Sequence, residues 1–221
     1  MSRGLHIVFS RPAVAESWLR ADGLCCERGE RVLFEALDIA LAPGDILQIE
    51  GANGSGKTSL LRILAGLLAP TGGTLRWRGT DIDTVREVYR AQLVYIGHKD
   101  GLKAELTARE NLAFGLALSG RAPSQPIDAA LDALCLSAHV DTPIGQLSAG
   151  QRRRVALARV LIVPAPLWLL DEPFTALDRT GIAQIEALLR SHAQRGGMAI
   201  VSTHHALQLP CRRLRLSAES A

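Results

Sequence analysis

The residues from Gly51 to Thr58 follow the pattern G-x-x-x-x-G-K-[ST] of a phosphate-binding loop. Its glycines allow backbone N–H groups to curl around an anion, and the helix that follows adds partial positive charge at its N-terminus. Lys57 can reach the β- and γ-phosphates, and the Thr58 hydroxyl suits Mg²⁺. A glycine-rich turn without a ligand would not need this lysine and threonine. We therefore predict a nucleoside triphosphate site formed by Gly51, Ala52, Asn53, Gly54, Ser55, Gly56, Lys57 and Thr58.

Two acidic residues, Asp171 and Glu172, come directly after the apolar run from Leu167 to Leu170. A phosphate-loop enzyme needs a carboxylate at a strand end to hold Mg²⁺, and Asp171 fits that role. It also needs a group that polarises the attacking water, and Glu172 fits. Two acids at a strand end are common by themselves, but downstream of a phosphate loop they indicate hydrolysis.

A third candidate segment runs from Leu147 to Gln151. Ser148 and Gln151 have the S-x-x-Q spacing of a capping box at a helix start. Together with Gly150, such a helix start offers free N–H groups and a hydroxyl to a phosphate. The sequence thus predicts a second phosphate-contacting segment, in addition to its structural role as a helix cap.

The elements around these segments alternate between strands and helices. An apolar strand from Ile46 to Glu50 enters the phosphate loop, and a helix from Ser59 to Leu68 leaves it, stopped by Pro70 and two glycines. Further helices are predicted from a capping box at Thr107–Glu110 to about Leu118, over Ile127–Leu136, and from about Ala149 to Ile162. This alternation favours an α/β fold with a mostly parallel sheet. Residues 101–145 contain helical patterns and no good strand, which indicates an inserted helical subdomain.

Composition narrows the function further. The chain has 221 residues and a net charge of +3 without a concentrated basic stripe, so no nucleic-acid partner is predicted. The longest apolar stretch, Val155–Leu170, is interrupted by Arg159 and two prolines and is too short to span a bilayer. Residues 1–17 lack the apolar core of a signal peptide and are predicted to be a disordered extension. A protein inside the cell is expected, and a membrane role would need another subunit.

The order of these segments resembles the ABC-transporter ATPase subunits. Leu147–Gln151, about twenty residues before Asp171-Glu172-Pro173, resembles the signature motif of that family. Ala176-Leu177-Asp178 resembles its D-loop, and His204 resembles the switch histidine that contacts the γ-phosphate. The resemblance implies a RecA-like P-loop NTPase core with an antiparallel β subdomain and an inserted α-helical subdomain. We expect the ATPase domain over residues 18–216, its helical subdomain at about 101–148, and a tail at 217–221.

The same resemblance implies how the site works. Two copies would form a homodimer that sandwiches two ATP molecules head to tail, with each phosphate loop facing Ser148, Gly150 and Gln151 of the other copy. Two positions depart from the family pattern. His98 stands where a glutamine usually reaches Mg²⁺ or the water, and Arg28 stands where an aromatic residue usually stacks on adenine. A guanidinium can also stack on a base.

A narrower resemblance is to the ATP-binding subunits of haem exporters in cytochrome c biogenesis. It is carried by Gly97-His98, by Gly101–Leu112, and by Pro166–Asp178. It implies integral membrane partners of the CcmB and CcmC kind, haem as indirect cargo, and a peripheral position on the cytoplasmic face of the bacterial inner membrane. The alternatives are an ABC ATPase with another cargo and a soluble ABC ATPase, although soluble members usually carry tandem domains or long coiled-coil insertions. A GTPase would need an Asn-Lys-x-Asp segment, which the sequence lacks, and a kinase would not explain Leu147–Gln151.

Overall fold

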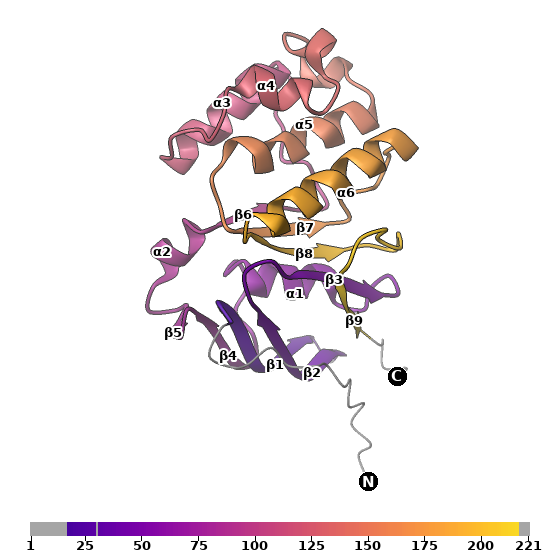
Figure 1. The fold of residues 1–221 in the computed structure, drawn as a ribbon. Helices are drawn as coiled ribbons and strands as arrows, with labels where there is room; N and C mark the ends of the chain where they lie inside the picture. The colour runs from indigo at the N-terminus through magenta and orange to yellow at the C-terminus, as the bar shows by residue number, and fades with distance from the viewer. Residues whose placement is uncertain (1–16, 30, 217–221) are drawn as a thin grey trace.

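The computed structural model describes residues 17–29 and 31–216. The extension predicted over residues 1–17, apart from Ser17, and the tail predicted at 217–221 lie outside the described residues. The chain forms two sheets with helices between and above them (Figure 1).

The central sheet is parallel and carries the segments singled out above. Its five strands lie in the order β6-β7-β8-β3-β9, namely β6 Leu93–Ile96, β7 Leu167–Asp171, β8 Met198–Ser202, β3 Ile46–Gly51 and β9 Arg212–Leu216. All residues of β7 and β8 are buried, as expected for strands covered on both faces. Because the strands are parallel, their carboxyl ends meet at one edge of the sheet. The phosphate loop, Asp171-Glu172, His98 and His204 therefore all follow strands that end at this edge.

The second sheet is antiparallel and uses the N-terminal strands. Its order is β2-β1-β4-β5, with β1 Leu19–Arg28, β2 Arg31–Leu41, β4 Gly72–Trp77 and β5 Thr80–Asp81. Helix α1, Lys57–Leu64, lies between the two sheets, and its Leu60, Leu61 and Leu64 are fully buried in the core that both sheets share. The predicted extension of α1 to Leu68 is wrong, because Gly66 already takes a left-handed conformation and ends the helix.

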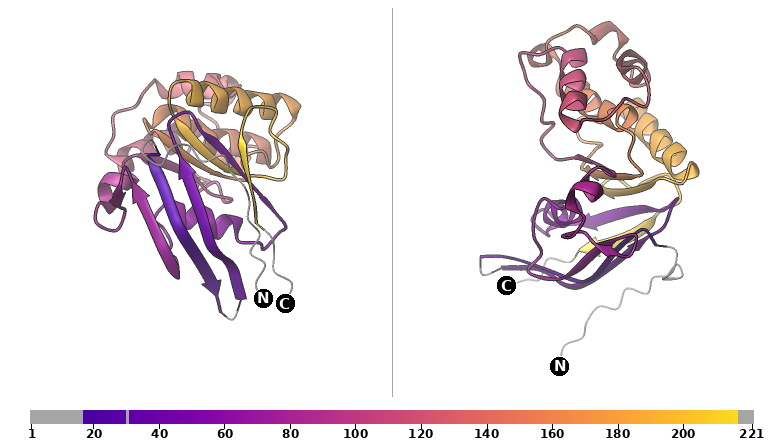
Figure 2. Two further views of the ribbon diagram at one scale, coloured as in Figure 1. Left: turned by 60° about the horizontal axis from the view of Figure 1, so that its bottom comes forward. Right: turned by 90° about the vertical axis from the view of Figure 1, so that its left-hand side faces the viewer.

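Helices α5 Ala149–Ile162 and α6 Arg179–Gln194 cover the other face of the parallel sheet, and α3 Ala108–Ser119 and α4 Ile127–Asp132 pack beyond α5. The short helix α2, Arg86–Arg90, lies on the α1 side instead, where its Tyr89 is buried in the core that contains α1. Figures 1 and 2 show α5 and α6 next to the sheet and α3 and α4 beyond α5, at the end of the molecule farthest from the antiparallel sheet. The predicted helix over Ile127–Leu136 is shorter than expected, since the chain turns at Cys135, which has a positive φ of 56°. Within residues 17–29 and 31–216, no helix has the length and apolarity needed to cross a bilayer.

Candidate active site

The phosphate loop joins β3 to α1 as the sequence predicts. Gly56 caps α1 in a left-handed conformation, with φ of 96°, which a residue with a side chain adopts at a cost. Lys57 is 8% exposed, and its Nζ donates to the carbonyl oxygens of Gly51 at 2.7 Å and Ala52 at 3.1 Å. The Ser55 hydroxyl is buried and has no hydrogen-bond partner in the described part of the chain. The loop thus holds an ammonium group and an unsatisfied hydroxyl at a helix N-terminus, where an anion is favoured.

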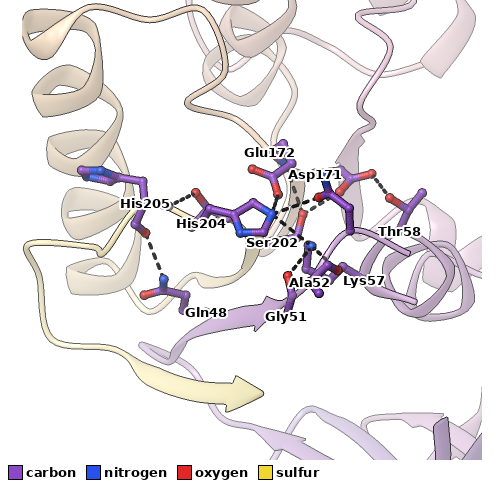
Figure 3. A network of polar contacts seen from close by, with 12 residues as sticks. Gln48, Gly51, Ala52, Lys57, Thr58, Asp171, Glu172, Ser202, His204 and His205 are labelled. Carbon is purple, nitrogen blue, oxygen red and sulfur yellow. Dashed lines mark hydrogen bonds and ion pairs between the residues drawn. The ribbon is translucent and has the colours of Figure 1, made fainter. Parts of the chain in front are cut away.

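Asp171 is held by hydroxyl groups on both carboxylate oxygens. Thr58 Oγ1 donates to Asp171 Oδ2 at 2.8 Å, and Ser202 Oγ donates to Oδ1 at 2.5 Å (Figure 3). The residue is 1% exposed, so these bonds take the place of water around a buried carboxylate. The Thr58 hydroxyl and the Asp171 carboxylate form the hard oxygen donor set that Mg²⁺ prefers, and they lie beside the phosphate loop.

Glu172 adopts an unusual backbone conformation at the end of β7. Its φ is 49°, in the left-handed region that non-glycine residues rarely occupy. Its N–H donates to the carbonyl oxygen of Ser202 at 3.0 Å and lies 3.1 Å from the Ser202 hydroxyl. The Glu172 side chain is 21% exposed and so remains partly open to water. Backbone strain of this kind concentrates at functional sites.

His204 lies between the loop and Glu172 (Figure 3). Its Nε2 is 3.3 Å from Lys57 Nζ, 3.3 Å from Asn53 Oδ1 and 3.6 Å from Glu172 Oε1. With Nε2 unprotonated, the ring accepts from the Lys57 ammonium; with Nε2 protonated, it can donate to Asn53 or Glu172. Which of these three side chains the imidazole contacts therefore depends on which ring nitrogen carries the hydrogen.

Lys57, Thr58, Asp171, Glu172 and His204 line one cavity of about 660 Å³. Arg28 and His98, predicted to contact the base and the reacting phosphate, also line it, and both are exposed. Three lining residues were not singled out from the sequence as site residues, namely Leu33 on β2, Ser59 on α1 and Thr175 after β7. None of them carries a distinctive residue pattern, and only the packing of the antiparallel sheet against the loop brings Leu33 to this place.

Ser148, Gly150 and Gln151 are absent from the walls of this cavity. The capping box predicted at Ser148 is confirmed, since its hydroxyl accepts from Gln151 N–H at 3.2 Å and its N–H donates to Gln151 Oε1 at 2.8 Å. Gln151 Nε2 is also 2.8 Å from Nε2 of His139. A Cβ atom on Gly150 would lie 2.6 Å from the carbonyl oxygen of Ala176, so only glycine allows this close approach.

Asp178 caps helix α6 and links it to α5. Its Oδ1 accepts from the N–H of Gly181 at 2.9 Å and from Arg154 Nη2 at 2.6 Å. These contacts, the backbone N–H first and the arginine next, lower the pKa of the Asp178 carboxyl below its usual value. Asp178 therefore remains ionised at neutral pH and ties the start of α6 to the helix that begins at Ser148.

Ser202 is a further residue that the sequence did not single out. It contacts both acids of the site, through the Asp171 carboxylate and through the Glu172 N–H. A signal was present, because Ser202 is the polar end of an otherwise apolar strand and lies two residues before His204. The neighbours of Ser202 on the adjacent strand could not be inferred, because a single sequence does not determine the order of strands in a sheet.

Comparison with known proteins identifies the family. The family model described as ABC transporter matches residues 34–175. The curated CcmA of Methylococcus capsulatus, named a cytochrome c biogenesis ATP-binding export protein, is 53% identical over 92% of this chain and 100% of its own length. The chain belongs to the CcmA family of ABC-transporter ATP-binding proteins. The CcmA of Pseudomonas putida is 52% identical over 86% of this chain and 90% of its own length. The CcmA of Yersinia pseudotuberculosis is 48% identical over 86% of this chain and 87% of its own length.

Solved structures confirm the fold of this CcmA-family chain. A dimeric ATP-binding cassette in a post-hydrolysis state, bound to ADP and phosphate, superposes with a TM-score of 0.79 at 24% identity, covering 91% of this chain and 97% of the other. A putative ABC transporter ATP-binding protein from Pyrococcus furiosus gives 0.77 at 23% identity, covering 90% and 96%. The prediction of an ABC ATPase fold is thereby confirmed.

Proposed function

We propose that this CcmA-family chain is the ATP-hydrolysing subunit of an ABC complex that powers haem export, or haem-chaperone release, in c-type cytochrome biogenesis. The observation that carries the proposal is the 53% identity to a protein named a cytochrome c biogenesis ATP-binding export protein, over that protein's entire length. The site geometry supports the ATPase part independently, because the described side chains around the 660 Å³ cavity include a lysine, two acids and two histidines of the kinds that phosphoryl transfer to water uses.

The phosphate loop would bind the triphosphate through its backbone N–H groups, with Lys57 released from its two carbonyl partners to contact the β- and γ-phosphates. Thr58 and Asp171 would hold Mg²⁺, whose contribution is to neutralise charge on the β- and γ-phosphate oxygens. Arg28 would stack on the base from the rim of the same cavity. These roles use side chains that already lie within reach of one another.

Glu172 would act as the general base, orienting the attacking water and accepting its proton. The carboxylate is suited to this role because its backbone is fixed by Ser202 while its side chain stays partly open to water. His204 would contact the γ-phosphate, and His98, which lines the same cavity, would approach the water or metal. Hydrolysis would then remove the γ-phosphate that these groups share.

A second copy of the chain would complete the site. Ser148, Gly150 and Gln151 do not line their own protomer's cavity, yet they form a capped helix start suited to a phosphate. A head-to-tail homodimer would place them against the partner's ATP. ATP would then join the two subunits, and hydrolysis would release them. Integral membrane subunits of the CcmB and CcmC kind would convert that cycle into movement or release of haem, with this chain bound peripherally to the cytoplasmic face of the inner membrane.

A genetic experiment tests the whole proposal. We expect that a strain lacking this subunit makes no holo-c-type cytochromes, as detected by haem staining of membrane and periplasmic fractions. The wild-type gene should restore them, whereas Lys57→Ala, expressed to the same level, should not. Normal haem staining in the deletion strain would contradict the assignment to cytochrome c biogenesis and leave the ATPase family membership intact.

A further inference from the structure

Arg153 is a buried arginine on α5 that no part of the proposed function uses. Its side chain is 5% exposed and lies just past the Ser148–Gln151 capping box. A buried guanidinium needs several hydrogen-bond partners to offset its loss of water. Arg153 finds those partners in two separate segments of the site.

The first segment is the turn at the end of β7, where the two site acids lie. Arg153 Nη2 donates to the carbonyl oxygen of Asp171 at 2.6 Å and to that of Glu172 at 3.0 Å, and Nε donates to that of Pro173 at 3.4 Å. The planar fork of the guanidinium can serve three consecutive carbonyl groups in one geometry, which a lysine cannot reproduce. Arg153 therefore fixes the backbone that carries the predicted general base.

The second segment follows β6 and contains His98. Arg153 Nη1 donates to the carbonyl oxygen of Gly97 at 2.9 Å and to the Asp100 carboxylate at 2.9 Å. These contacts flank His98 on both sides, so one side chain holds the segments that carry Glu172 and His98. The same side chain projects from the helix that begins at Ser148.

The Glu172 turn needs such an anchor because its conformation is unfavourable. A non-glycine residue in the left-handed region costs about 1 kcal/mol or more, and it persists only where surrounding contacts hold it. Ser202 binds the N–H of Glu172, and Arg153 binds its carbonyl oxygen. The two contacts thus hold both the N–H and the carbonyl group of the strained residue Glu172.

We propose that Arg153 is a positioning residue for hydrolysis, which holds the Glu172 turn and the Gly97–Asp100 segment in register with each other and with helix α5. The part concerning turnover rests on the proposed function, whereas the anchoring of the turn does not. The competing interpretation is a buried arginine that only stabilises the fold.

The test uses the full chain and a conservative pair of variants. Arg153→Lys keeps the charge but loses the fork, and Arg159→Lys makes the same change on the same helix. Arg159 is also half-buried, and this burial lowers the pKa of its guanidinium. It lines a different and smaller cavity. Turnover and ATP affinity are measured by phosphate release and nucleotide titration. Amide hydrogen exchange is followed by mass spectrometry in peptides that cover residues 168–177, without nucleotide.

We expect kcat of Arg153→Lys to fall by about 100-fold, the size of effect that a small misplacement of a catalytic group produces, while KM changes by less than about threefold. Exchange in 168–177 should rise in this variant and not in Arg159→Lys, which should hydrolyse ATP at the wild-type rate. Unchanged exchange would overturn the anchoring whether or not the protein hydrolyses ATP. If Arg153→Lys loses thermal stability and ATP affinity together with turnover, Arg153 is only structural.

If Arg153→Lys does not fold, Asp100→Asn provides the second variant, because it removes the charge opposite Arg153 and keeps an acceptor. We then expect a smaller loss of kcat, of about threefold to tenfold, with raised exchange in the same peptides. Wild-type kcat and exchange in Asp100→Asn would overturn the link to the Gly97–Asp100 segment. If the wild-type protein has no ATPase activity, the proposed function is contradicted. The exchange data would still test whether Arg153 holds the Glu172 turn.

Discussion

The phosphate-loop region and the start of α5 are both suited to phosphate, but they are built differently. Around the loop, groups that follow four strands of the parallel sheet (β3, β6, β7 and β8) converge. Some of them are unsatisfied or can change partner, as with the Ser55 hydroxyl and the His204 imidazole. At the start of α5, the side-chain hydrogen bonds of Ser148 and Gln151 to described residues are made within the segment or with nearby His139. The first region therefore has groups that can react or rebind, whereas the side chains of the second region already have partners.

This difference separates two kinds of mutational effect. A change at the loop region should alter chemistry or nucleotide binding in a single protomer. A change at the α5 start should leave nucleotide binding by a single protomer intact and affect only the step that needs two protomers. The predictions below test that division, beginning with the largest effect.

Glu172→Gln should abolish most turnover while preserving ATP binding. The amide keeps the shape and partial hydrogen bonding of the side chain but cannot accept a proton, so we expect kcat to fall by about 10³-fold. Phosphate release measures turnover, and size-exclusion chromatography with ATP should show a trapped dimer. Glu87→Gln, at an exposed position on α2, is the matched control. Hydrolysis by Glu172→Gln at the native rate would show that the base is another residue.

Ser148→Arg should reduce hydrolysis by about 100-fold, because an arginine at the α5 start would block the approach of the partner's phosphates. ATP binding to dilute monomer, followed by fluorescent-nucleotide titration, should change little. The effect requires protein at concentrations where the wild type dimerises.

Thr107→Arg is a close control for this variant. Thr107 caps α3 with the same reciprocal capping box, so its replacement also removes a cap, worth about 1 kcal/mol of stability. Both variants should lose similar stability in thermal unfolding, but only Ser148→Arg should lose hydrolysis. Equal loss of hydrolysis in both variants, or loss of monomer binding in Ser148→Arg, would mean that the α5 start serves only folding.

Gly150→Ala should have a moderate effect that shows how closely the two regions are packed. The added Cβ would lie 2.6 Å from the Ala176 carbonyl oxygen, a backbone atom that must shift, and we expect a loss of about 1–3 kcal/mol in unfolding free energy. Gly115→Ala on α3 is the opposite case, since nothing lies within 4 Å of its Cβ position, and it should gain about 0.5–1 kcal/mol. Denaturant unfolding measures both, and a stabilising Gly150→Ala would contradict the close approach.

The sequence predicted the residues of the loop region better than the contacts that hold them. Lys57, Thr58, Asp171 and Glu172 could be read from local patterns, because each pattern carries its own chemistry. The residues that hold them in place could not be predicted, since Arg153 contacts two segments that are distant in sequence and meet it only in the folded protein. Arg152, Arg153 and Arg154 are consecutive, a pattern that is more often solvated surface. Arg153 is nevertheless buried.

Helix ends show the same limit at a smaller scale. The capping boxes at Thr107 and Ser148 were predicted correctly because both partners lie within four residues. The ends of α1 and α4 were misplaced, because apolar periodicity continued past Gly66 and Cys135, where the backbone turns to positive φ. Periodicity reports which face is buried, and it does not report where the backbone leaves the helix.

Arg28 should give the smallest effect, and its test separates stacking from charge. If the guanidinium stacks on the base, Arg28→Ala should weaken ATP binding by about threefold to fivefold, in line with exposed cation–π contacts, and leave inorganic tripolyphosphate binding unchanged. Arg28→Lys should resemble the alanine variant for ATP, because a lysine keeps the charge and loses the planar face. Competition titrations with ATP and tripolyphosphate measure both. If Arg28→Ala weakens both ligands equally and Arg28→Lys restores them, Arg28 contributes only charge to the phosphate loop, and the base must be recognised elsewhere on the cavity wall.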